Sequence, residues 1–309
     1  MKLRIGTRGS PLAVAQTRQV ATVLEASCDR LEVEIVRVST TGDRVRDRPL
    51  RDCGGKGLFV RELDEALLGG DIDCAVHSLK DVPSELPEGV ALAAVPRRAN
   101  PSDLLISLGG HSLEGLPPRA VVGTTSPRRA AQLLAVRGDL RIELLRGNVG
   151  TRLKRLISGD FDATLLARAG IERLGVNIAP AHAVVLDPRR FVPSPGQGAI
   201  GLTARLDDSR RRELLESIQD ASSRACVDAE RSLAASLGGS CYLPVGAYCE
   251  EDGDEVRLWG LVVSPDGKMV VRDQETGSRG EAFELGYGLG RRLLDAGGEE
   301  ILAVLEMPR

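Results

Sequence analysis

The chain has 309 residues, of which 42% are hydrophobic, and it can bury more than one core, because single cores stop growing at roughly 250 to 300 residues. A net charge of −3 and an aromatic content of 3% argue against nucleic-acid binding, which needs a basic surface and aromatic side chains for stacking. No apolar run approaches the roughly 20 residues of a membrane-spanning helix and the first residues hold no apolar signal core, so we expect a cytoplasmic protein that does not enter membranes.

The first 175 residues alternate short β-branched runs with helix-like segments, a pattern typical of an α/β fold with largely parallel sheets. The expected strands are 2–6, 32–38, 73–77, 90–95, 119–123, 141–145 and 162–166. The expected helices between them include 11–26, 57–69, 127–136 and 149–158.

Two stretches rich in proline interrupt this pattern, at 96–101 and at 193–198, and they indicate passages between domains. After about residue 220 the pattern changes. A helical stretch at 222–237 leads to a glycine-rich segment, then to alternating runs around a turn at 264–268, and then to a final helix. This order predicts a small α+β domain with an antiparallel sheet.

Three strand ends share one design, in which a strand leads into small, hydroxyl and arginine residues and then into a helix. In two of them Ser10 and Ser126 directly precede proline, as N-cap residues do, so backbone N–H groups point outward and suit a carboxylate or a phosphate. The polar residues of the three ends are Arg8, Ser10, Thr124, Thr125, Ser126, Arg128, Arg129, Arg146 and Arg152. Ordinary capping with solvated arginines explains any single end, whereas three such ends converging on one cleft would make a site for several anions.

Lys80 and Asp81 follow the strand at 73–77 in the segment HSLKDVP. An aspartate on such a loop can stabilise a developing cation or carry a proton, and the adjacent lysine can bind an anion. A plain surface ion pair is the alternative. We expect His77 to be structural.

Six cysteines, at positions 28, 53, 74, 226, 241 and 249, form no CxxC pair and no Cys/His group at zinc-ligand spacing. We therefore expect free thiols and no metal site. Cys241 lies in the glycine-rich segment LGGSCYLP, where a flexible backbone can present a nucleophilic thiolate. A buried, inert cysteine is the alternative.

Taken together, these segments resemble, in order and spacing, the motif set of the porphobilinogen deaminase family. The matching segments are GTRGSPLA (6–13), GGKGLFVREL (54–63), HSLKDVP (77–83), GTTSPRR (123–129), LRGNVGTRL (145–153), ARAGIERLG (167–175), PGQGA (195–199) and ERSLAASLGGSCYLP (230–244). The resemblance covers nearly the whole chain. It implies two similar α/β domains, like the halves of type II periplasmic binding proteins, and a small α+β domain that carries the cofactor cysteine.

Carried onto this chain, the resemblance places the domain boundaries at the two proline-rich stretches. Domain 1 would comprise residues 1–96 and 197–217, domain 2 residues 101–192, and domain 3 residues 220–309. The implied activity is tetrapyrrole biosynthesis: four porphobilinogen molecules condense, with loss of ammonia, onto an enzyme-bound dipyrromethane primer, and hydrolysis releases hydroxymethylbilane. The implied protein is a monomer whose partner is this small-molecule substrate.

The resemblance also assigns roles to individual residues. Cys241 would hold dipyrromethane through a thioether, and Asp81 would be the catalytic carboxylate that stabilises the azafulvene and pyrrolenine cations. The cofactor's acetate and propionate arms would be held by Lys80, Thr124, Thr125, Ser126, Arg128 and Arg129. The arms of the substrate and the growing chain would be held by Arg8, Ser10, Arg146, Arg152 and Arg173.

Some positions depart from the family pattern. Asp52 and Cys53 stand where family members often carry lysine, in a segment near 42–57 that we expect to be a mobile loop. Ser240 replaces a common glycine and Leu243 a usual β-branched residue, and both changes are conservative. A two-domain anion-binding module without catalysis is the rival hypothesis, but it leaves Asp81 and Cys241 unexplained.

Overall fold

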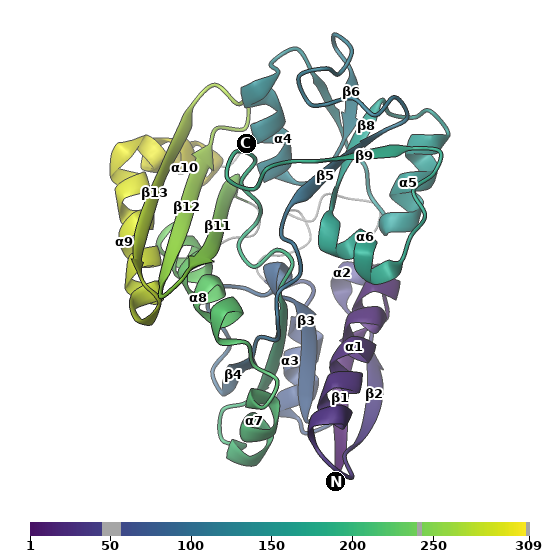
Figure 1. Ribbon diagram of the computed structural model, residues 1–309, viewed down its shortest axis with the longest axis vertical. Helices are drawn as coiled ribbons and strands as arrows, with labels where there is room; N and C mark the ends of the chain where they lie inside the picture. The colour runs from purple at the N-terminus through teal and green to yellow at the C-terminus, as the bar shows by residue number, and fades with distance from the viewer. Residues whose placement is uncertain (45–56, 240–242, 307–309) are drawn as a thin grey trace. The chain divides into compact units, whose positions relative to one another are not determined.

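The computed structural model describes residues 1–44, 57–239 and 243–306 (Figure 1). The chain divides into two compact units. Unit 1 comprises Met1–Ala99 and Gly198–Arg224, and unit 2 comprises Asn100–Gln197 and Ala225–Arg309. The passages after Ala99 and after Gln197 fall in the proline-rich stretches. Three domains were expected, and the chain divides into two units. Unit 2 contains two separate sheets, and its division into two domains stays a prediction.

Unit 1 is built on a five-stranded sheet with the order β2-β1-β3-β10-β4. Its strands are β1 (Lys2–Arg8), β2 (Glu32–Val38), β3 (Cys74–Ser78), β4 (Val90–Ala94) and β10 (Ile200–Arg205). Its helices are α1 (Pro11–Ser27), α2 (Thr41–Arg44), α3 (Arg61–Leu68), the 3₁₀ turn η2 (Leu79–Asp81), α7 (Ser209–Glu216) and the first turn of α8 (Ala221–Ser236).

Unit 2 contains a second five-stranded sheet, with the order β7-β6-β8-β5-β9, and a three-stranded sheet, β11-β12-β13. The strands are β5 (Asp103–Ser107), β6 (Val121–Gly123), β7 (Arg141–Glu143), β8 (Ala163–Ala167), β9 (His182–Val185), β11 (Val245–Asp252), β12 (Glu255–Val263) and β13 (Val270–Ser278). The helices are α4 (Pro127–Val136), α5 (Val149–Ile157), α6 (Arg168–Leu174), η3 (Arg279–Glu281), α9 (Ala282–Leu293), the π-helical η4 (Leu294–Gly298) and α10 (Glu299–Glu306).

The two five-stranded sheets are copies of one architecture. In each, the second, first and third strands of the βαβ run are parallel neighbours. The strand that follows a passage between the units, β10 in one sheet and β5 in the other, lies antiparallel between the third and fourth strands. This shared order confirms the expected α/β fold class, with the same arrangement of largely parallel strands in both sheets.

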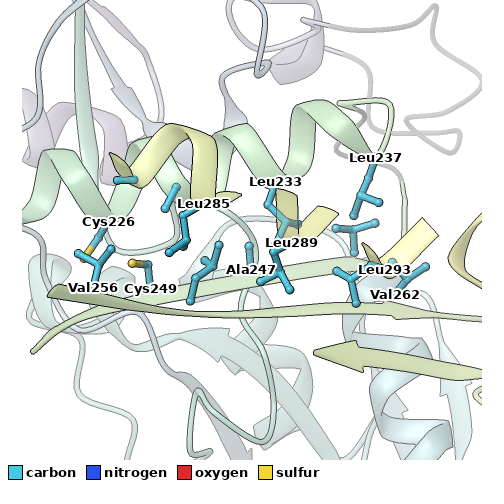
Figure 2. Packing of buried hydrophobic residues seen from close by; sticks show 14 of the residues in the cluster. Cys226, Leu233, Leu237, Ala247, Cys249, Val256, Val262, Leu285, Leu289 and Leu293 are labelled. Carbon is cyan, nitrogen blue, oxygen red and sulfur yellow. The ribbon is translucent and has the colours of Figure 1, made fainter. Parts of the chain in front are cut away.

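The three-stranded sheet is antiparallel throughout, as predicted, and packs one face against helices α8 and α9 (Figure 2). Alternate residues of β11 and β12, such as Ala247 and Leu258, face this core because strand side chains alternate between the two faces. They meet Leu233 of α8 and Leu289 and Leu293 of α9, all of them fully buried. Leu237 belongs to this core and Leu243 packs against it, on either side in sequence of residues 240–242, which lie outside the described residues.

Helix α3 buries a carboxyl group, that of Asp64, which is 6% exposed. Burial, with a smaller contribution from Glu65, raises the pKa of Asp64 to about 6. The folded-state pKa lies above the unfolded value of roughly 3.9, so folding favours the protonated acid. Stability should therefore fall as the pH rises from about 4 to above 6.

We expect Asp64→Asn to stabilise the protein, since the neutral amide avoids the cost of burying a charge. The gain should be on the order of 1 kcal/mol larger at pH 8 than at pH 5, measured as free energy of unfolding in urea. The exposed neighbour Glu65 supplies the control, Glu65→Gln, which should change little. A gain for Asp64→Asn that is the same at both pH values would contradict this expectation.

Candidate active site

Arg8 and Asp81 lie at one edge of the unit 1 sheet. Strands β1 and β3 are parallel neighbours, with Ile5 opposite Cys74, so their carboxyl ends lie at the same edge. Arg8 ends β1 and Asp81 ends the 3₁₀ turn after β3. The Nη1 atom of Arg8 is 3.5 Å from Oδ2 of Asp81, and the Asp81 side chain is 33% exposed. The structure thus brings together two site residues that are 73 positions apart.

Phe59 packs against Arg8 and was not identified from the sequence. The guanidinium carbon of Arg8 lies 4.1 Å from the centroid of the Phe59 ring, a cation–π contact that limits the arginine's rotamers. Gly42 leaves room for this ring, since a Cβ atom at Gly42 would clash with Phe59. The only indication of Phe59 in the sequence is that it belongs to the family motif GGKGLFVREL.

The other polar residues of this edge have mixed roles. Ser10 is the N-cap of α1, its Oγ accepting from the N–H of Ala13 at 3.3 Å, and Pro11 follows it. Lys80 is half-buried beside Asp81. His77 is buried with Nε2 3.0 Å from Oγ1 of Thr203, and burial, together with the charge of Arg8, lowers its pKa to about 4. His77 is therefore a neutral, structural residue at pH 7.

In unit 2, the loop after β6 and the start of α4 hold the predicted hydroxyl residues. Oγ1 of Thr124 accepts from the N–H of Ser126 at 3.2 Å, and Thr124 is buried while Thr125 and Ser126 are half-buried. Ser126 caps α4, its Oγ accepting from the N–H of Arg129, and Pro127 follows it. The predicted arrangement of N-cap serine and proline is confirmed at both helices.

Arg128 and Arg129, in the first turn of α4, are buried and share one carboxylate. Nη2 of each lies 2.7 Å from an oxygen of Asp103. Their Nη1 atoms donate to the carbonyl oxygens of Val192 and Leu165, at 2.7 and 3.0 Å. Their Nε atoms are buried without a hydrogen-bond partner. Asp103 was not predicted from the sequence, and both arginines were expected only to bind anions.

The remaining arginines stand near the same edge of the unit 2 sheet, because β7 and β8 are both parallel to β6. Arg146 follows β7 and is half-buried. Arg152, on α5, donates from Nε to the carbonyl oxygen of Gly147 at 2.8 Å. Arg173, on α6 after β8, is half-buried. Burial lowers the pKa of Arg173, and the neighbouring Glu172 partly offsets this.

Each unit therefore carries one group of predicted site residues at the carboxyl edge of its parallel strands. Cys241 lies outside the described residues, as do Ser240, Asp52 and Cys53 and most of the loop expected near 42–57. Cys28, Cys74, Cys226 and Cys249 are free. Within 1–44, 57–239 and 243–306, no cluster of His, Cys, Asp or Glu could hold a metal ion, and no helix has the length and apolar character to cross a membrane.

Comparisons with known proteins point to one family. Residues 3–213 match the family described as porphobilinogen deaminase, dipyromethane cofactor binding domain, and residues 224–295 match its C-terminal domain. The chain is 46% identical over 301 residues to a porphobilinogen deaminase of Roseiflexus castenholzii, covering 97% of this chain and 98% of the relative. It is 42% identical to that of Maridesulfovibrio salexigens, covering 97% of each.

Solved structures with a related fold are more distant. The methionine binding protein MetQ is 14% identical, with a TM-score of 0.44 over 71% of this chain and 90% of its own. The BenM effector binding domain with its effector benzoate is also 14% identical, with a TM-score of 0.43 over 77% of this chain and 94% of its own. These likenesses are too low to bear on function.

Proposed function

The chain belongs to the porphobilinogen deaminase family, and from this membership we propose that its two groups of strand-end residues, one in each unit, serve the same reaction. The family makes the chain a transferase of tetrapyrrole biosynthesis that condenses porphobilinogen and uses dipyrromethane as its cofactor. In the unit 1 group, Asp81 would act on the reacting carbon and nitrogen, and Arg8, Ser10 and Lys80 would bind carboxylate arms. The unit 2 group would hold carboxylate arms.

The residues of unit 2 fit the cofactor's chemistry. Dipyrromethane carries two carboxylates on each pyrrole, and the first turn of α4 places two guanidinium groups against one carboxylate, which leaves a net positive charge in a buried position. The helix dipole adds to this charge. We propose that Cys241 holds the cofactor through a thioether and that its arms bind Lys80, Thr124, Thr125, Ser126, Arg128 and Arg129. When bound, dipyrromethane would supply the free pyrrole carbon at which the first unit is joined.

Asp81 is the residue we assign to the chemistry, and its position beside Arg8 is the observation that carries this proposal. Loss of ammonia from the aminomethyl group of porphobilinogen leaves positive charge on the pyrrole. The carboxylate of Asp81, accessible and 3.5 Å from Nη1 of Arg8, can stabilise that charge and accept the proton released after coupling. The cation–π contact with Phe59 holds Arg8 in place.

Substrate and growing chain bring further carboxylates, which we assign to Arg8, Ser10, Arg146, Arg152 and Arg173. Charge-assisted hydrogen bonds contribute roughly 1.5 to 3 kcal/mol each. Every added pyrrole brings two more negative charges, so an arginine-rich edge is needed to bind the lengthening chain. Four such additions followed by hydrolysis would release hydroxymethylbilane.

We also propose that the protein works in the cytoplasm as a monomer. The free thiols of Cys28, Cys74, Cys226 and Cys249 suit a reducing compartment. The monomer rests on family membership alone, and sedimentation of the purified protein tests it.

The intact mass of the denatured protein tests the covalent cofactor. We expect an excess over the sequence mass equal to two linked pyrroles, lost in Cys241→Ser and retained in the control Cys28→Ser. The same excess should react with an aldehyde reagent for pyrroles. An unmodified mass that stays unchanged after incubation with porphobilinogen would instead support an anion-binding protein without catalysis.

A further inference from the structure

Asp103, the first residue of β5, is fully buried at 0% exposure. Three side chains donate to its carboxylate. Arg128 and Arg129 do so at 2.7 Å, one to each oxygen, and Nε2 of Gln197 donates to Oδ1 at 2.9 Å. A buried carboxylate with this many charge-assisted bonds is held in one orientation.

These donors come from separate segments that the carboxylate joins. Asp103 lies just after the chain enters unit 2, and Gln197 is the last residue before the chain leaves it. Nε2 of Gln197 also donates to the carbonyl oxygen of Pro101 at 2.7 Å. The two arginines belong to the first turn of α4. One carboxylate thus connects both passage segments to the helix start where the cofactor arms are proposed to bind.

Asp103 supplies the one negative charge that both guanidinium groups of this cluster share, which leaves them with a net charge of +1. Arg128 and Arg129 have side chains that are only 5% and 7% exposed, and Asp103 is the acidic partner that both share. Burial alone would raise the pKa of Asp103, but the two guanidinium groups hold it well below its usual range. Without the carboxylate, the two adjacent cations would repel each other, and their Nη1 atoms would keep the carbonyl contacts to Val192 and Leu165.

We propose that Asp103 is a positioning residue for cofactor binding: it orients Arg128 and Arg129 and sets the net charge of the first turn of α4 at one positive rather than two. Asp103 does not bind the cofactor's arms itself but acts through the two arginines. This inference rests on the proposed function, because it concerns the arms of the same dipyrromethane.

The test uses the full chain produced in cells that make no porphobilinogen. Porphobilinogen is then added, and the rate at which the protein gains the mass of two linked pyrroles is measured for each folded variant. We expect Asp103→Asn to slow this loading by about tenfold or more, the effect of losing one charge-assisted interaction. The control is Asp139→Asn, which breaks the exposed ion pair with Arg137 at the other end of α4 and should load at the wild-type rate.

A double-mutant cycle separates positioning from a merely structural role. If Asp103 acts through Arg128 and Arg129, then adding Asp103→Asn to the variant Arg128→Gln/Arg129→Gln should slow loading no further. If the two effects multiply, Asp103 acts independently and the inference is wrong. It is equally wrong if Asp103→Asn lowers only the free energy of unfolding and loads at the wild-type rate.

Asp103→Asn leaves two buried cations without a counter-charge, which costs stability and can prevent folding. In that event the triple variant Asp103→Asn/Arg128→Gln/Arg129→Gln, which lacks both cations, is compared directly with Arg128→Gln/Arg129→Gln. Equal loading supports the inference, and a further slowing of about tenfold overturns it. If the wild-type protein gains no mass, the proposed function itself is wrong. If the wild type and Asp103→Asn both load normally, the proposed function stands and only this inference is wrong.

Discussion

Replacing Asp81 by Asn should lower kcat for porphobilinogen consumption by about 10² to 10⁴-fold, the usual contribution of a positioned acid–base group. Asparagine keeps the shape of the side chain but has neither the negative charge that stabilises a cation nor the basicity to accept a proton. The Asp81 side chain is 33% exposed and its pairing with Arg8 is long, at 3.5 Å. Its loss should therefore leave the fold intact.

The result is informative only if the cofactor remains in place. The intact mass of Asp81→Asn should still show two linked pyrroles, and its urea unfolding curve should match that of the wild type. Glu85→Gln provides the control, since Glu85 is an exposed carboxylate four residues further along the chain. Asp81→Glu, which restores the charge one methylene away, should recover part of the rate. Turnover of Asp81→Asn within about threefold of the wild type would remove Asp81 from the chemistry.

The sequence predicted those parts of the fold that depend on neighbouring residues. All seven strands expected before residue 175 are present, because alternating β-branched runs followed by helical segments specify βαβ units locally. The helix starts at Ser10 and Ser126 were predictable for the same reason, since an N-cap serine followed by proline is a signal within one turn.

Three strands were missed, namely β5, β9 and β10. Each is short, and two of them directly follow the proline-rich passages, where no helix precedes the strand to mark a βαβ unit. Strand β5 forms only because it pairs with β8 and β9, about 60 to 80 residues further along the chain. Such long-range pairing leaves no periodic pattern in the five residues of β5.

The environment of the site residues was harder to predict than their identity. Arg128 and Arg129 were recognised as part of an anion-binding helix start, but their burial depends on Asp103, which is 25 positions before Arg128. A single aspartate before an apolar run is typical of a turn, and nothing local indicates two arginine partners. Phe59 was missed for a similar reason, because its contact with Arg8 spans the unit 1 sheet edge. The roles of all these residues toward cofactor and substrate stay predictions until the variants are measured.

Helices α8 and α9 meet backbone to backbone, and two glycines on α9 provide a sharp test of that contact. A Cβ atom at Gly286 would clash with the carbonyl oxygen of Ala229 on α8 and lie 3.1 Å from its Cα atom. At Gly288, two residues further along the same helix, a Cβ atom would meet nothing within 4 Å. The same substitution should therefore have opposite effects at the two positions.

Gly286→Ala should destabilise the protein by about 1 to 3 kcal/mol, because the helices must separate and loosen the core around Leu233 and Leu289 (Figure 2). Gly288→Ala should stabilise it by roughly 0.5 to 1 kcal/mol, since alanine loses less backbone entropy in a helix. Free energies of unfolding in urea measure both. Equal changes would mean that α8 and α9 do not approach closely at Gly286. Because α8 precedes the segment that carries Cys241 by only a few residues, a loosened contact should also lower the fraction of protein that acquires its cofactor.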